Sequence, residues 1–301
     1  MNSNSLKRNS FIIAFFGALL FSCKAIFIKM AYWYTIDKLS LLTLRMGFAF
    51  PFYLGFAIYQ SNKKINVKTK PFFKDWILLV VLGILGYYFA SFLDLWGLKY
   101  ISAGMERLIL FVYPTITTLL AAFLFKRKIG RKKIWAIILT YIGISLAFWD
   151  KLTFQEIEHF WLGAMLIFGS ALTFSFFLVG SERLIPKYGS MKFTNYSMIV
   201  SCLVTLLHFF IVSDTDLFSF RWEIYAIALA ISTVSTVLPS FMMSYAIKNI
   251  GASSTAITSS IGPIWVLVLA YFILGESFSF FQVLGTLIVI AGVWVTSQTK
   301  K

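Results

Sequence analysis

The chain has 301 residues, of which 59% are apolar and only 13% charged, and its mean hydropathy is +0.82. Soluble domains carry about 25% charged residues, so this composition excludes an ordinary soluble protein and indicates a membrane protein. The formal net charge of +15 would suit a nucleic-acid-binding protein, but the placement of the basic residues, described below, indicates membrane topology and no nucleic-acid partner. Cys23 and Cys202 both lie within apolar runs and provide no disulfide framework.

Ten apolar stretches are long enough for a membrane-spanning helix, which needs about 20 residues. They cover residues 11–31, 41–59, 76–98, 105–125, 133–149, 160–180, 194–213, 222–246, 253–274 and 279–297. The first stretch follows Lys7 and Arg8, as the apolar part of a signal peptide would. It is too long and lacks a small-residue cleavage site, so we predict an uncleaved first span. The connections are short, and we expect no appended soluble domain.

The charges of the connecting segments set the orientation of the spans. If the N-terminus is cytoplasmic, the alternate segments on that side hold 19 of the 27 basic residues. These segments are residues 1–10, 62–74, 126–133, 183–192, 248 and 298–301. The opposite side holds eight of the 12 acidic residues. Because cytoplasmic segments are enriched in Lys and Arg, the sequence predicts ten spans in the cell (inner) membrane with both termini cytoplasmic. The cluster "KRKIGRKK" (126–133) is then a topology signal.

The chain repeats itself with a shift of 149 residues. "GLKYISAGMERLILFVYPTITTLLAAFLF" (97–125) aligns without a gap on "AIKNIGASSTAITSSIGPIWVLVLAYFIL" (246–274), and seven of the 29 positions are identical. The repeats are predicted over residues 11–149 and 160–297, between cytoplasmic segments 1–10 and 298–301. Each repeat holds five spans, and this odd number turns the second repeat upside down relative to the first. Inverted repeats are typical of secondary transporters, whose substrate site lies near the midplane between the halves.

At this point the chain resembles a known family. The segments "FSCKAIFIKM", "LTLRMGFAF" and "GLKYISAGMERLILFVYPTITTLL" are similar to the first repeat of EamA-type members of the drug/metabolite transporter superfamily. "AIKNIGASSTAITSSIGPIWVLVLAYFILGESF" and "GTLIVIAGV" are similar to the second repeat. The resemblance implies a ten-helix carrier with a central cavity, which moves small metabolites and often exports amino acids. The chain departs from the family at "FKRK" (125–128), where other members often have a Gly-Glu pair like Gly275–Glu276.

The charged residues of the predicted spans all belong to the first repeat. They are Lys24, Lys29, Arg45, Asp94, Glu106 and Arg107. Gly17, Lys24 and Ala31 share a helix face on which small residues favour close packing. We therefore predict that Lys24 lines the cavity and holds a substrate anion, with a structural ion pair to Asp94 as the alternative. Arg45 is a second substrate-binding candidate, for which a structural pair with an acid is equally open. Asp94 and Glu106 are predicted coupling residues, because carboxylates facing a cavity can relay protons. For Glu106 an interaction with the helix dipole competes.

Polar side chains at helical spacing add further substrate-binding candidates. Tyr87 and Ser91 form a stripe with Asp94, and Tyr113 and Thr117 form a stripe with Glu106. From the second repeat, Thr258 occupies the position equivalent to Ile109.

Three prolines within the apolar runs, Pro114, Pro239 and Pro263, predict helix kinks, because proline lacks the N–H that an interior helix turn requires. The carbonyl groups freed in this way either line the cavity or bind a Ser or Thr hydroxyl.

Together these patterns predict a secondary transporter of a small polar metabolite. The substrate is expected to be an amino acid or another carboxylate-bearing compound, exported by alternating access. The alternative is a membrane scaffold or receptor of the same fold. An enzyme is not expected, because the sequence has no Ser–His pair at membrane depth, one deep aspartate and no GxxxxGK[ST] motif. We expect no cofactor or metal. The expected partners are the substrate and the lipid bilayer, while proton coupling and a homodimer stay open.

Overall fold

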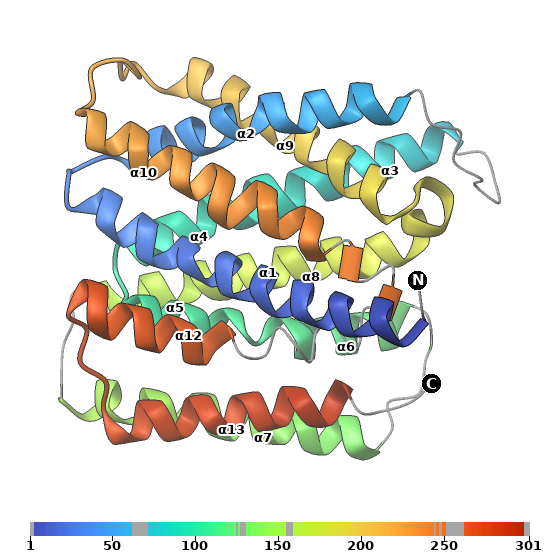
Figure 1. Ribbon diagram of the computed structural model, residues 1–301. Helices are drawn as coiled ribbons and strands as arrows, with labels where there is room; N and C mark the ends of the chain where they lie inside the picture. Colours follow the sequence, from blue (N-terminus) through green and yellow to red (C-terminus); the bar gives the residue numbers. More distant parts are fainter. Residues whose placement is uncertain are drawn as a thin grey trace.

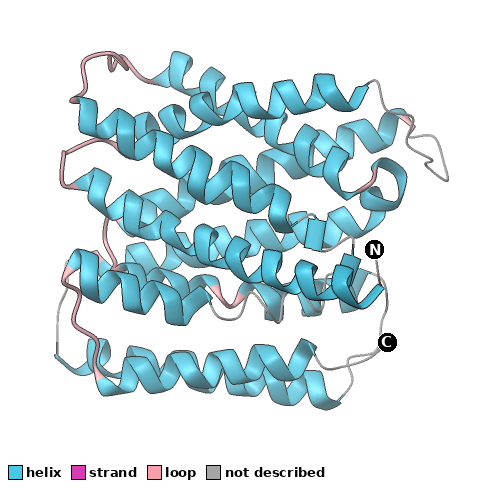
Figure 2. Ribbon diagram, in the orientation of Figure 1, coloured by secondary structure: helices cyan, strands magenta, loops and turns pink. Residues whose placement is uncertain are grey.

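The computed structural model describes residues 3–61, 72–124, 126, 131–154, 159–243, 245–246, 249–250 and 262–297. In this part of the chain the secondary structure is helical, and loops join the helices (Figure 2). The predicted Thr258 lies outside the described residues. The elements, in chain order, are α1 Ser3–Tyr32, α2 Lys38–Ser61, α3 Phe73–Gly83, η1 Ile84–Phe89, α4 Ala90–Leu98, α5 Ala103–Leu110, α6 Tyr113–Leu124, α7 Arg131–Phe154, α8 Phe160–Tyr188, α9 Ser190–Val212, α10 Trp222–Ser232, η2 Thr233–Val237, α12 Gly262–Leu269, η3 Ala270–Leu274 and α13 Phe280–Ser297.

Among the described residues, seven helical segments are long and apolar enough to cross a membrane, and each of them coincides with a predicted span. They are Arg8–Tyr32, Lys38–Gln60, Phe73–Leu98, Ala103–Leu124, Phe160–Ser181, Met191–Val212 and Trp222–Met243. Two shorter apolar helical segments, Gly262–Leu274 and Phe280–Gly292, lie within the last two predicted spans. The chain is therefore a multi-pass helical membrane protein.

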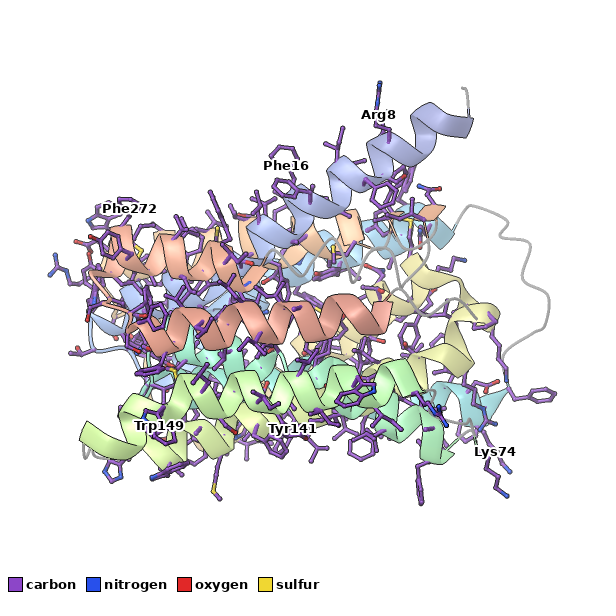
Figure 3. The ribbon with its side chains drawn as sticks, turned by 90° about the horizontal axis from the view of Figure 1, so that it is seen from below. Arg8, Phe16, Lys74, Tyr141, Trp149 and Phe272 are labelled. Atoms are coloured by element: carbon purple, nitrogen blue, oxygen red, sulfur yellow. The ribbon has the colours of Figure 1, made fainter. Side chains whose placement is uncertain are left out.

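The helices lie side by side along a common direction, with the described loops at the two ends of the bundle (Figure 1). Helix α1 begins and α13 ends at the same end. Large apolar side chains coat the outside, among them Phe16 and Phe272, which point away from the bundle (Figure 3). Phe16 is 52% exposed and Phe272 is 78% exposed. Such a surface would cost free energy in water, whereas in a bilayer it contacts lipid.

The packing of the helices brings the two halves of the chain together. Helix α2 packs against α9 and α10, and α3 also packs against α9. Helix α1 packs against α12, and α6 packs against α8. Helices α7 and α13 form a separate antiparallel pair at one edge of the bundle (Figure 1). The largest buried cluster lies around α2 and includes Met46, Tyr53 and Cys202.

Three of the predicted spans contain, within the described residues, a turn of π-helix, in which one extra residue widens the helix. These turns are η1, which joins α3 to α4, η2, which follows α10, and η3, which follows α12. Within η1, a Cβ atom on Gly86 would lie 2.3 Å from Cγ of Phe177, so only glycine permits this approach of η1 to α8. η1 begins at Ile84 and η2 begins 149 residues later, at Thr233.

The fourth predicted span is interrupted. Helix α5 ends at Leu110 and α6 begins at Tyr113, so Phe111 and Val112 separate two helices. Pro114 is the second residue of α6, and its missing N–H explains why the helix cannot run through this point. The predicted break at Pro114 is therefore present, as an interruption of two residues.

Candidate functional site

Four charged side chains meet in the interior of the bundle, and we call them the charged centre. Lys24 comes from α1, Asp94 from α4, and Glu106 and Arg107 from α5. None of the four is more than 5% exposed. The Lys24 Nζ atom lies 2.5 Å from Oδ2 of Asp94, and Arg107 Nε lies 3.8 Å from Oε2 of Glu106. A charge in the membrane interior is tolerated when it has a partner of this kind, so Asp94 explains how α1 carries a lysine within its apolar run.

The two carboxyl groups of the charged centre also face each other. The carboxyl groups of Asp94 and Glu106 lie close enough to interact, although no hydrogen bond joins them in the described structure. Within the described residues, no donor reaches Oδ1 of Asp94 or either carboxyl oxygen of Glu106. Two ionised carboxylates have only acceptor atoms and repel each other, so this contact is favourable when one of them holds a proton. Such a pair is chemically suited to hold one shared proton.

Phe21 lies between the two cations of the centre. Its ring centroid is 5.5 Å from Lys24 Nζ and 5.7 Å from Arg107 Cζ. At these distances the face of an aromatic ring attracts a cation. The Nε and Nη2 atoms of Arg107 are buried and have no hydrogen-bond partner among the described residues. The Arg107 guanidinium therefore keeps donors available for a ligand or for Glu106.

The N-terminus of α5 is held by a residue from the second half of the chain. Glu276, in the loop between η3 and α13, accepts hydrogen bonds from the backbone N–H groups of Ala103 (2.8 Å) and Gly104 (3.3 Å). Ser102 Oγ accepts a further bond from Met105 N. The first turn of a helix has N–H groups without intrahelical partners, and a carboxylate there also interacts favourably with the helix dipole. Glu276 thus fixes the start of the helix that carries Glu106 and Arg107.

Arg45 lies apart from the charged centre, on α2, and is 4% exposed. Its Nε donates a hydrogen bond to Oγ1 of Thr236 in η2, at 3.0 Å. The Thr236 hydroxyl in turn donates to the carbonyl oxygen of Ile231, five residues earlier, at 2.9 Å. Five-residue spacing is that of the π-turn, so Thr236 both completes the turn and positions the guanidinium. The Nη1 atom of Arg45 has no partner in the described part of the structure.

Each polar stripe expected from helical spacing crosses an irregular turn. Tyr87 lies in η1, where the wider turn shifts the residues that follow around the helix axis. The centroid of its ring lies 4.8 Å from that of Phe177 in α8. Asp94 meets α1 instead, through Lys24. In the second stripe, the interruption between α5 and α6 lies between Glu106 and Tyr113.

The remaining predicted residues of these two stripes are buried or half-buried. Ser91 is 8% exposed. The Tyr113 ring contacts Phe174 of α8 at 5.4 Å. The Thr117 hydroxyl has no hydrogen-bond partner in the described part of the chain. A substrate contact of these residues stays a prediction.

The other two prolines belong to the eighth and ninth predicted spans. Pro239 is buried and follows η2 by two residues, and Pro263 is the second residue of α12. At the break near Pro114, the Ser175 hydroxyl of α8 lies 3.1 Å from the carbonyl oxygen of Tyr113. The carbonyl that the missing N–H of Pro114 frees is that of Leu110, one turn earlier, so the choice between the two alternatives for the prolines stays a prediction.

Two residues of the site had no predicted role. Glu276 belongs to the "LGE" segment that carries the family resemblance, but a loop carboxylate gives no sequence signal for the helix that it caps. Thr236 lies in "ISTVSTVLPS" (231–240) among several hydroxyl residues, and only the tertiary structure selects it as the partner of Arg45.

The comparison with known families decides the identity of the chain. The EamA-like transporter family matches residues 9–149 and, a second time, residues 161–298. The chain belongs to this family. It is 28% identical over 281 residues to the uncharacterized transporter YcbK of Bacillus subtilis (strain 168), covering 91% of this chain and 88% of YcbK. It is 23% identical over 269 residues to the biotin transporter of Escherichia coli (strain K12), covering 86% and 84% of the two chains.

The fold of this EamA-like transporter is also found among solved structures. One crystal structure superposes with a TM-score of 0.67 over 96% of both chains, at 14% sequence identity. At this identity the likeness concerns the fold alone. The family match, the transporter relatives and the apolar helices together identify a membrane transporter whose partners are a small-molecule substrate and the lipid bilayer.

Proposed function

We propose that this EamA-like protein is a secondary transporter that exports a small polar metabolite across the cell membrane by alternating access, and that the charged centre couples this movement to protons. An amino acid or another carboxylate-bearing compound is the proposed substrate. The observation that carries the proposal is the contact between the buried carboxyl groups of Asp94 and Glu106 beside two cations. Ionisable groups at membrane depth are costly, and in transporters they form proton relays and substrate sites.

Ten spans arranged as two inverted repeats are part of the proposal, and the packing supports them. A shift of 149 residues converts α1 into α8 and α12 into α6. The contact of α1 with α12 then corresponds to that of α8 with α6, and the contact of α3 with α9 corresponds to that of α10 with α2. The π-turns η1 and η2 obey the same shift. Contacts that recur when the two halves are exchanged are expected of a pseudo-twofold arrangement.

Equivalent links between the halves also occur at the two ends of the bundle. At one end, Lys187 at the α8–α9 corner lies 2.7 Å from Asp75 in the first turn of α3. At the other end, Arg221 before α10 lies over the ring of Tyr34 at the α1–α2 corner, at 5.6 Å. Each corner of one repeat thus contacts the start of the third span of the other repeat. If the two repeats rock against each other, the link at one end would have to open while the link at the other end stays closed.

We propose that the end at which α1 begins faces the cytoplasm. This end carries Arg8 and Lys74, both labelled in Figure 3, together with Arg131 and Lys187. The loop between α9 and α10 at the opposite end carries Asp214 and Asp216. The excess of basic residues at one end supports a cytoplasmic location for both termini.

Transport can be tested without knowing the substrate. The purified protein is reconstituted into liposomes loaded with a mixture of amino acids and organic acids, and mass spectrometry identifies what leaves. We expect one chemical class of carboxylate-bearing metabolite to leave wild-type vesicles and to stay in protein-free vesicles. The variant Arg183→Gln, which changes an exposed arginine, serves as the matched control and should release the same class. Equal retention of every compound with and without protein would contradict the proposal and favour a scaffold or receptor.

A further inference from the structure

We propose that Arg45, and not Lys24, is the group that binds the substrate's carboxylate, in a subsite formed with Thr236 where the two repeats meet. This inference rests on the proposed function and specifies how the site recognises its substrate. It starts from a difference between the buried cations in how their charge is compensated.

Each cation of the charged centre has a carboxyl group beside it. Lys24 is paired with Asp94 at 2.5 Å, and Arg107 has the Glu106 carboxylate at 3.8 Å. In contrast, no carboxylate within the described residues lies within 4.0 Å of Arg45, although its side chain is equally buried. An isolated buried charge is strongly unfavourable unless a counter-charge accompanies it. Of the three buried cations that the structure describes, Arg45 is therefore the one with no carboxyl group in contact, although the charge of Asp94 acts on it from further away.

The hydrogen bonding of Arg45 leaves Nη1 of its guanidinium unused. Nε is engaged by Thr236 Oγ1 at 3.0 Å, which fixes the orientation of the planar group. Nη1 is buried and without a partner in the described part of the structure. A guanidinium binds a carboxylate through two parallel N–H groups. Nη1 of Arg45 offers one such group, with its orientation already set by the bond to Thr236.

The surroundings favour an anion with a single charge. Ser232 and Ser235 lie on the same segment as Thr236, and their buried hydroxyl groups have no described hydrogen-bond partner. Tyr53 of α2 and Ser240, which follows η2, are uncharged, and their hydroxyl oxygens are hydrogen-bonded to each other at 3.0 Å. One guanidinium neutralises one negative charge, whereas a phosphate dianion would leave a second one buried and uncompensated. The ligand class that fits is a monocarboxylate.

The position of the subsite links ligand binding to the relative position of the repeats. Arg45 belongs to the first repeat and Thr236 to the second, so the bond between them crosses the boundary between the halves. A carboxylate bound to Arg45 lies at this boundary, where movement of one repeat against the other changes its surroundings.

Thermal unfolding of the purified full-length protein tests the inference, because a ligand that binds the folded state raises the unfolding temperature. The probes are acetate, butyrate, benzoate and alanine, each compared with its uncharged or carboxyl-amidated analogue at matched ionic strength. We expect carboxylates to stabilise the wild type more than the amides do. Arg45→Met should weaken this apparent affinity about thirtyfold or more, and Arg45→Lys should weaken it less. The control Arg183→Met should behave as the wild type.

A second readout separates a ligand-binding arginine from a structural one. If the Arg45 charge is uncompensated, Arg45→Met should unfold without probe at the same temperature as the wild type or higher. A clear fall in that temperature, or failure to fold, would make Arg45 structural and overturn the inference. So would a carboxylate effect that persists in Arg45→Met, or the absence of any carboxylate effect in the wild type. If the wild type binds carboxylates through Arg45 but transports nothing, this inference stands and the proposed transport function fails.

Discussion

The Nζ atom of Lys24 lies 2.5 Å from Oδ2 of Asp94, and the two side chains are 7% and 1% exposed. This contact joins α1 to α4 in the interior of the bundle. Because Lys24 lies eight residues before the end of α1 at Tyr32, it is about 12 Å from that end along the helix axis. The lysine side chain is too short to bring its ammonium group to the membrane surface from this depth, so the ion pair is what makes the position tolerable.

The first prediction follows from the mutual dependence of these two residues. Asp94→Asn leaves a buried ammonium group without a counter-charge, which costs about 3–5 kcal/mol of stability. Lys24→Met alone leaves a buried carboxylate, although Glu106 can share a proton with it, so its cost should be smaller. The double variant Lys24→Met/Asp94→Asn removes both charges and should recover most of the stability. Unfolding temperatures of the purified variants measure these differences.

The double-mutant comparison also has a clear negative outcome. If the losses of the two single variants simply add in the double variant, the two residues do not stabilise each other. The ion pair would then have no energetic role, and Lys24 would return to its predicted place as a direct substrate ligand.

The sequence predicted which charges are buried, but their pairing depends on tertiary structure. Runs of about 20 apolar residues identify spans because the bilayer fixes their length, and any charge within such a run is conspicuous. Whether Lys24 meets Asp94 or a ligand depends on how α1 is rotated against α4, and small residues on one face of α1 are compatible with both. The periodicity of apolar and small residues therefore cannot decide whether Lys24 binds the substrate or pairs with Asp94.

The polar stripes cross irregular turns for a physical reason that concerns the helices themselves. The prediction from Tyr87 to Asp94 assumed 3.6 residues per turn throughout, whereas η1 contains a wider turn at Tyr87. The residues of "ILGYYF" contain no pattern that indicates a π-turn. Pro114, in contrast, was a usable signal, because the chemistry of proline alone requires a break in the hydrogen-bonding pattern.

The second prediction concerns the cap on α5. Glu276→Gln keeps the size of the side chain but removes its charge, and Glu276→Ala removes both acceptors for Ala103 N and Gly104 N. We expect a loss of about 0.5–2 kcal/mol for the alanine variant and a smaller loss for the glutamine variant. Thermal unfolding shows which of the two variants has lost more stability. An alanine variant as stable as the wild type would show that the cap does not hold α5.

The third prediction concerns the pair of helices α7 and α13. A Cβ atom on Gly143 would lie 2.6 Å from the carbonyl oxygen of Gly285 and 2.9 Å from the backbone nitrogen of Val289. Backbone atoms cannot rotate away, so Gly143→Ala must separate the two helices, at a cost of about 1–3 kcal/mol. Gly55→Ala is the matched control, because nothing lies within 4 Å of the added atom. Equal unfolding temperatures of the two variants would contradict this packing.

The fourth prediction tests the orientation in the membrane. In a variant without Cys23 and Cys202, single cysteines are placed at Thr215, in the exposed α9–α10 loop, and at Lys74, at the opposite end of the bundle. An impermeant thiol reagent added to intact cells should label position 215 and leave position 74 unlabelled until the membrane is opened. The reverse pattern would place both termini outside the cytoplasm.

The central claim is that the carboxyl pair Asp94–Glu106 couples substrate movement to protons, and proton flux in proteoliposomes tests it most directly. The measurement records the internal pH of vesicles when the carboxylate released in the metabolite screen is added outside. For the wild type we predict a substrate-dependent change in internal pH, and substrate accumulation when a pH gradient is imposed. Glu106→Gln, which cannot exchange the proton, should lose both effects while it still folds and binds the substrate. Accumulation driven by the pH gradient in Glu106→Gln at the wild-type rate would contradict the account.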